Sequence, residues 1–164
     1  MLLPVNNKAS NLKNLQPSTF NLFPMAKNIS IIDIKAPAQK VWDALMQPAA
    51  VKKWQYGSDL ITDWKPGNDI RFSTAWEDKV FEQWGKVLEI IPCSLIRYSL
   101  FAPGPGLEDL PENYFIMSYM LSENDGTTRL EIVQEDNRPG AKQEPPQGDE
   151  NPILAALRAF AESE

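Results

Sequence analysis

Between Asp59 and Glu135 the apolar residues alternate with polar ones, and most of the alternating segments are separated by only a few residues. An alternation of period two is typical of β-strands. Connections this short join antiparallel neighbours, because a parallel crossover needs a dozen residues or more. One connection, Lys65-Pro66-Gly67-Asn68, has the proline and glycine of a type II turn. The pattern predicts strands over residues 59–62, 70–76, 80–91, 95–101, 113–121 and 127–135, with a bulge or bend at Gly85.

Helical segments stand on both sides of this strand region. A β-branched strand over residues 29–35 is followed by a helix that Pro37 opens, and Pro48 starts a second, short helix that reaches Trp54. In the last segment, residues 151–162, Asn151 can cap the helix and the apolar residues share one face. That face must be buried on the sheet. The sequence therefore predicts an α+β domain whose curved antiparallel sheet, of about six to seven strands, surrounds a C-terminal helix.

The first 24 residues differ in composition from the rest of the 164-residue chain. They contain two lysines, five asparagines and three prolines, and no acidic residue. The leading apolar run is too short for a signal peptide. We interpret residues 1–24 as a disordered or loosely attached tail, with Met25 as an alternative initiator and Phe20-Asn21-Leu22-Phe23 as an alternative strand or anchor. The folded domain then covers residues 25–164.

The absence of histidine removes most familiar catalytic sites. With 0 histidines and the single cysteine Cys93, the chain cannot form a Ser-His-Asp triad, a histidine or cysteine zinc site, or an internal disulfide. We predict no catalytic residue, no metal and no cofactor, and a single thiol fits a reducing, cytoplasmic compartment. The formal net charge of −6 disfavours nucleic acid and anionic membranes as partners. No apolar run approaches the roughly 18 residues of a membrane span.

Several short segments, taken in their order along the chain, resemble one family. They read IKAPAQKVWDAL from Ile34, VKKW from Val51, DWKPG from Asp63, WGKVLEIIP from Trp84 and DGTTRL from Asp125. This order is similar to that of the START-like superfamily called SRPBCC. Within it, the chain resembles the domain related to the C-terminal part of the activator of the heat-shock protein 90 ATPase.

The resemblance covers about residues 29–162 and implies a fold rather than a reaction. It implies the helix-grip fold of START and birch-pollen-allergen domains, with a cavity between the sheet and the C-terminal helix. Two departures concern that cavity, because the terminal helix is short and the loop over residues 138–150 is long and rich in proline and acid. The short helix would leave the cavity more open, whereas the loop would cover it, and the sequence does not choose between them.

Large side chains on the expected inner face are the candidates for binding a ligand. A site for an apolar guest needs aromatic walls and a few polar groups. In the family topology Trp54 lies at the mouth of the cavity, and an arginine that reached it would bind a carboxylate. Arg97 and Tyr98 are adjacent on one strand and must point to opposite faces. The candidate set is Trp54, Phe72, Trp76, Arg97, Met117, Tyr119, Leu130 and Leu157; alternatively, these side chains simply fill the core.

Three functions remain open at this point. The first is a single START-like domain that binds a small hydrophobic ligand and has no catalytic activity of its own. The second is a co-chaperone-like module that stimulates the heat-shock protein 90 ATPase, although the chain resembles only part of that activator. The third is an enzyme similar to polyketide cyclases, which work mainly through the shape of their pocket and need no histidine.

Overall fold

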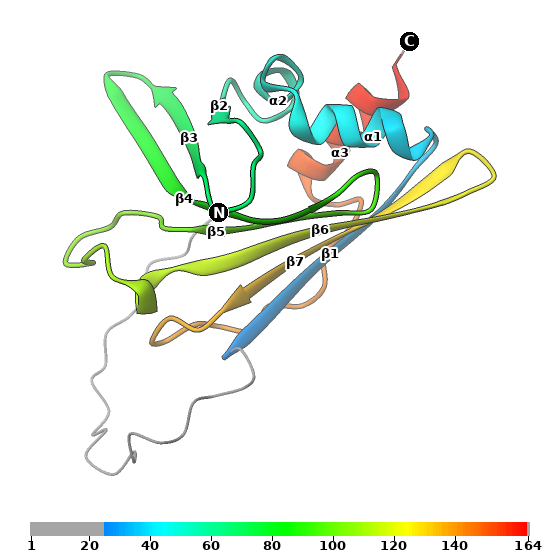
Figure 1. The fold of residues 1–164 in the computed structure, drawn as a ribbon. Helices are drawn as coiled ribbons and strands as arrows, with labels where there is room; N and C mark the ends of the chain where they lie inside the picture. The colour runs from blue at the N-terminus through cyan, green and yellow to red at the C-terminus, as the bar shows by residue number, and fades with distance from the viewer. Residues whose placement is uncertain (1–24, 164) are drawn as a thin grey trace.

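Seven antiparallel strands form one sheet, and three α-helices pack on one of its faces in the part of the chain that the structure describes (Figure 1). This computed structural model describes residues 25–163, so the predictions made for residues 1–24 lie outside the described residues. The elements are β1 (Ala26–Ile34), α1 (Ala38–Met46), α2 (Pro48–Trp54), β2 (Asp59–Thr62), β3 (Asp69–Trp76), β4 (Lys79–Ile91), β5 (Leu95–Leu100), the 3-10 turn η1 (Pro111–Asn113), β6 (Phe115–Asn124), β7 (Thr127–Asp136) and α3 (Pro152–Glu162).

The order of the strands follows from the connections between them. From β2 to β7 each strand pairs with the next one along the chain, and β1 closes the order as β1-β7-β6-β5-β4-β3-β2. Because β1 and β2 stand at opposite edges, α1 and α2 carry the chain across one face of the sheet (Figure 1). The α+β helix-grip architecture predicted from the sequence is confirmed. Among the described residues no helix is long and apolar enough to cross a membrane.

Two turns have the backbone conformation that their residue types predict. Gly67 has φ +89°, as the third residue of a type II turn requires. The β6–β7 hairpin turns at Asp125 and Gly126, both with positive φ, which is the two-residue connection that suits the twist of a hairpin.

The irregularity predicted at Gly85 lies elsewhere. The register between β4 and β5 shifts between Val87 and Glu89, so the bulge is at Leu88 and the prediction of a bulge at Gly85 is wrong. Gly85 serves a different purpose, because the backbone of β5 passes very close to it. A Cβ atom at this position would lie 1.9 Å from the carbonyl oxygen of Ser99. Glycine is needed here for the close approach of two strands.

The core lies between the inner face of the sheet and the three helices. Val41 of α1, Val51 of α2 and Leu157 of α3 are fully buried against Ile96 and Leu130 of the sheet. The alternation along the strands and the helical spacing of the apolar residues both direct these side chains to one layer, where the removal of apolar surface from water stabilises the fold. The side chain of Asn151 accepts hydrogen bonds from the first turn of α3, as its position predicts.

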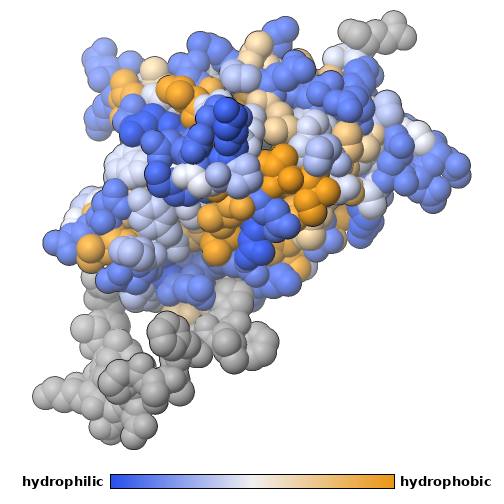
Figure 2. All heavy atoms as spheres, in the orientation of Figure 1, coloured by the Kyte–Doolittle hydropathy of each residue, from blue (hydrophilic) through white to orange (hydrophobic). Residues whose placement is uncertain are grey.

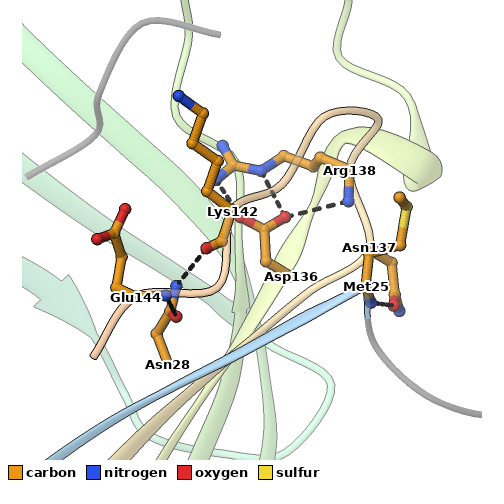
Figure 3. Close-up of polar contacts among 7 residues, drawn as sticks. All are labelled: Met25, Asn28, Asp136, Asn137, Arg138, Lys142 and Glu144. Carbon is orange, nitrogen blue, oxygen red and sulfur yellow. Dashed lines mark hydrogen bonds and ion pairs between the residues drawn. The ribbon is translucent and has the colours of Figure 1, made fainter. Parts of the chain in front are cut away.

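The long loop before α3 pairs with the open edge of β1. Ile31 N donates to Gln147 O at 2.9 Å, and Gln147 N donates to Ile29 O at 3.0 Å. Nearer its start, the loop is held by Asn28, which donates to Lys142 O and accepts from Glu144 N (Figure 3). An edge strand paired in this way is protected against pairing with another chain.

An ion pair fixes the point at which the loop leaves β7. Arg138 donates to both carboxylate oxygens of Asp136, at 2.8 and 2.6 Å, and both side chains are largely buried (Figure 3). The guanidinium also lies over the ring of Phe115, 4.7 Å from its centre. Beside this pair, Met25 N donates to the side chain of Asn137, so the described chain begins next to the start of the loop.

Candidate functional site

The concave inner face of the sheet is only partly covered by helices. The eleven-residue helix α3 packs against β1, α1 and α2. Met117 and Tyr119 of β6 and Ile132 of β7 point to the same face but are only partly buried. Of the two departures noted in the sequence, the short helix thus leaves part of the inner face uncovered, and the long loop reaches that face where Arg138 lies over Phe115.

A pair of tyrosines forms the polar centre of this inner face. The hydroxyls of Tyr98 and Tyr119 lie 2.5 Å apart and their rings meet edge to face, with 5.6 Å between the ring centres. Burial raises the pKa of Tyr119, and burial together with the neighbouring Tyr119 raises the pKa of Tyr98 well above its ordinary value. Both phenols are therefore protonated at neutral pH. When one donates to the other, the second O–H group is free to donate to a carbonyl or ether oxygen.

Several of the predicted residues meet around this pair. The rings of Phe72 and Tyr98 have centres 5.8 Å apart, and Met117 lies opposite Tyr98 in the strand register. Leu130 and Leu157 are fully buried and belong to the packed layer beneath the helices.

Three predicted residues lie away from the concave face or from a cavity mouth. Arg97 points to the outer face of the sheet, where it pairs with Glu135 at 3.2 Å, because the alternation of β5 gives the inner face to Tyr98. Trp54 is 7% exposed and donates its indole N–H to Ala44 O at 2.8 Å, so it joins α1 to α2. Trp76 shares the face of Phe72 but is 67% exposed, because it lies at the far end of the β3–β4 hairpin.

A hollow lies on the opposite, outer face of the sheet, and the sequence did not predict it. It has a volume of about 1390 Å³ and lies over β2, β3 and β4 and the chain from Asp109 to Ile116. We call it the outer groove. Its described lining residues are Ile61, Thr62, Asp63, Gly67, Asn68, Asp69, Ile70, Arg71, Trp84, Gly85, Lys86, Leu88, Ser99, Asp109, Pro111, Glu112, Tyr114, Ile116, Glu135 and Asn137.

Trp84 organises one wall of the outer groove. Its indole N–H donates to Asp109 at 2.9 Å, and Tyr114 donates to the other oxygen of Asp109 at 2.6 Å. These hydrogen bonds, with that of Tyr114 the stronger, lower the pKa of the Asp109 carboxyl. Arg71 stacks over the Trp84 ring at 5.3 Å and pairs with Glu82. The alternation of β4 places Trp84 on this face, but the contact with Asp109 depends on a loop whose path no periodicity predicts.

The described residues contain no cluster of side chains suited to bind a metal ion. Within residues 25–163 no three cysteine or carboxylate side chains are grouped so that they could hold an ion. Cys93 is partly buried and its thiol is hydrogen-bonded to Gln39. The side chains described above on the two faces are aromatic rings, phenols and carboxylates.

Comparison with known proteins identifies the family. Residues 35–160 match the family model described as activator of Hsp90 ATPase homolog 1-like protein. The chain belongs to this family. This agrees with the resemblance of its motifs to the SRPBCC superfamily.

Solved structures of other proteins share the fold. A Cytophaga hutchinsonii protein solved in solution is 34% identical, with a TM-score of 0.56 over 66% of this chain and 76% of its own. A crystal structure of a Chromobacterium violaceum protein is 22% identical, with a TM-score of 0.67 over 84% of this chain and 98% of that one. An HSP90 activator from Plasmodium falciparum is 14% identical, with a TM-score of 0.55 over 71% and 76%. The last two likenesses concern the fold alone. No curated protein matches the chain.

Proposed function

We propose that this member of the family binds a small, mostly apolar molecule on the concave face of the sheet, beside the Tyr98–Tyr119 pair, and has no catalytic activity of its own. The observation that carries the proposal is the phenol pair on a face that α3 leaves partly uncovered. A ligand with one carbonyl, ether or hydroxyl oxygen would accept the free phenol O–H. Its apolar part would lie against Met117 and Ile132.

The apolar area around the pair supports this choice of ligand. Met117, Tyr119 and Ile132 keep part of their surface exposed, and Phe72 packs on the ring of Tyr98. Burying this surface under a guest contributes about 25 cal/mol for each Å² removed from water. A charged ligand is disfavoured, because the Tyr98–Tyr119 pair is neutral at neutral pH and Arg97, the expected partner of a carboxylate, faces the other way.

Two methionines on β6 give a matched test. Met117 points to the concave face and Met120 to the outer face, three residues further along the same strand. The probe is the fluorescent dye Nile red, which is uncharged, mostly apolar and carries a carbonyl oxygen that can accept a hydrogen bond. We expect saturable binding to the wild-type protein, a large loss of affinity in Met117→Trp, because the added ring occupies the site, and unchanged binding in Met120→Trp.

The same pair of variants can refute the proposal. Equal dye binding by the wild-type protein and Met117→Trp, with both folded by circular dichroism, would exclude the concave face. A loss confined to Met120→Trp would assign binding to the outer face instead. Native against denaturing mass spectrometry of protein purified from its own host then identifies the ligand, as an extra mass that disappears on denaturation.

A second candidate function is stimulation of an Hsp90-type ATPase, the activity for which both the family and the Plasmodium falciparum protein are named. One feature of this chain favours it. The end of the β3–β4 hairpin exposes Trp76, Val80 and Phe81, each more than half accessible to solvent. Exposed apolar side chains gathered at one place commonly mark a surface that contacts another protein.

This candidate is tested by the ATPase rate of the chaperone with and without the protein. Stimulation should be lost in the double variant Trp76→Ser, Phe81→Ser and kept in Ile91→Ser, which removes a similarly exposed apolar side chain at the other end of β4. No stimulation by the wild-type protein would eliminate the co-chaperone function and leave ligand binding untouched.

A further inference from the structure

The outer groove has apolar side chains that solvent reaches. Trp84 and Leu88 of β4 and Ile116 of β6 form its floor, and Ile61 lies at its β2 end. Ile61 is 59% exposed and Leu88 is 42% exposed. On the face that Figure 2 draws, apolar side chains likewise gather in one area of a mostly polar surface. Exposed apolar side chains that gather at one place commonly mark a surface that contacts a partner.

The carboxylates of the groove outnumber its cations. The described lining contains Asp63, Asp69, Asp109, Glu112 and Glu135 against Arg71 and Lys86. Both cations are already paired with carboxylates, Arg71 with Glu82 and Lys86 with Asp69. Among the described residues, Asp63, Asp109 and Glu112 form no ion pair.

Two of these carboxylates are held by neutral hydrogen-bond donors. Asp63 accepts from the backbone N of Lys65 at 2.9 Å and from the side-chain amide of Asn68 at 2.7 Å, and Asp109 accepts from its two aromatic neighbours. These hydrogen bonds lower the pKa of both carboxyls, so both are ionised at neutral pH. Negative charge beside an apolar floor favours an occupant that is apolar and carries positive charge.

The dimensions of the groove suit a stretch of polypeptide. It extends from Glu135 on β7 to Ile61 on β2, five strand spacings of about 4.8 Å, or about 24 Å. An extended chain rises about 3.3 Å for each residue, so about seven residues cross the groove. Its volume of about 1390 Å³ is above the roughly 300–1,000 Å³ of most small-molecule pockets.

We propose that the outer groove binds an extended segment of a partner protein, with apolar or aromatic side chains on the floor and lysine or arginine side chains beside Asp63, Asp109 and Glu112. A second copy of this chain is a poor occupant, because both copies carry a net charge of −6. The groove lies on the face opposite the proposed ligand site, and the inference does not depend on that site.

The test uses the full chain and a peptide of matching length and charge. The probe is the acetylated and amidated heptapeptide Lys-Thr-Phe-Thr-Phe-Thr-Lys, whose lysines and phenylalanines share one side when it is extended. It is titrated into protein with isotope-labelled tryptophan, and the indole N–H signals are followed by NMR. We expect a saturable shift of the Trp84 signal and none of Trp54, which is buried between α1 and α2.

Two control peptides separate charge from apolar contact. Glutamate in place of both lysines, or serine in place of both phenylalanines, should abolish the shift of Trp84. If the serine peptide bound as well as the probe, the groove would be a site for small organic cations, and the proposal would be overturned. No shift of Trp84 at millimolar probe would overturn it as well.

Two protein variants locate the attraction in the groove. Glu112→Lys reverses one of its unpaired charges at an exposed position and should weaken probe binding about fivefold at low salt. Asp78→Lys makes the same kind of change in the exposed turn of the β3–β4 hairpin, outside the groove, and should bind as the wild-type protein does. Circular dichroism checks that both variants are folded. Equal weakening in the two variants would refute the proposal, because the acidic protein as a whole would then attract the peptide.

Discussion

Replacing Gly85 with alanine should separate two strands at the centre of the sheet. The new Cβ would lie 1.9 Å from the carbonyl oxygen of Ser99, whereas carbon–oxygen contacts between strands are ordinarily about 3.3 Å or longer. The obstacle is backbone, so no side-chain rotation relieves it, and the strands must part by roughly 1.4 Å. The hydrogen bonds that Trp84 and Phe101 exchange, at 3.2 and 2.7 Å, are next to this contact and would be strained or lost.

The magnitude follows from these terms. Overpacking costs about 1–3 kcal/mol, and two weakened backbone hydrogen bonds cost about 1 kcal/mol each. The smaller entropy of the unfolded alanine chain returns about 0.4–1 kcal/mol. We expect Gly85→Ala to lower the free energy of unfolding by about 3 kcal/mol, which for a chain of this size lowers Tm by about 6–12 °C.

The assay is urea unfolding followed by circular dichroism, with a thermal melt as the second measurement. Gly104→Ala is the matched control, because nothing lies within 4 Å of its added Cβ and its φ is not in the left-handed region. The control should stay within about 0.5 kcal/mol of the wild-type protein. If Gly85→Ala matched the control, the close approach of β4 and β5 would not constrain this position and the reasoning would be refuted.

Three further substitutions test the packing, the helix cap and the tyrosine pair. Leu157→Ala should lower the free energy of unfolding by about 2–5 kcal/mol, because this side chain is fully buried. Asn151→Ala should cost about 1 kcal/mol, since it removes the acceptor for two N–H groups of α3. Urea unfolding measures both. The raised pKa of Tyr98 means that the folded state holds its phenol proton more tightly, so the stabilising effect is complete below the ordinary value of 10.0 and is lost as the pH rises above it. Tyr98→Phe should flatten this alkaline loss, measured as unfolding free energy from about pH 9 to pH 11.

The architecture was predictable because local patterns agreed with one another. The positive φ of Gly67 and of the Asp125-Gly126 turn follows from residue types that tolerate it, and the face of Leu157 follows from helical spacing. Given the number and order of the strands, the apolar face of the C-terminal helix can be buried in few ways, and packing on one face of the sheet is the simplest of them. Each of these features depends on residues close together in the sequence.

The candidate sites depend on contacts between distant residues, and for this reason the sequence predicted them less well. The family topology suggested Trp54 at a cavity mouth, but its indole is bound to Ala44. The sequence predicts that Arg97 and Tyr98 point to opposite faces of the sheet. Only the register of β5 in the structure shows which of the two points inward. The position of Asp109 beside Trp84 depends on a loop, where no period applies.

Side chains alternate along β5, so Tyr98 points to the concave face and Arg97 to the outer face. The same alternation separates the concave face from the outer groove. Neighbouring residues of β5 and β6 serve opposite faces, so Tyr119 belongs to the concave face and Met120 to the outer one. A side chain changed on one face leaves the other face's contacts in place unless the backbone itself moves. Gly85 is the position where it would move, because a Cβ there pushes directly on the backbone of β5. Variants at Met117 and at the groove therefore isolate one surface each, whereas Gly85→Ala should disturb both.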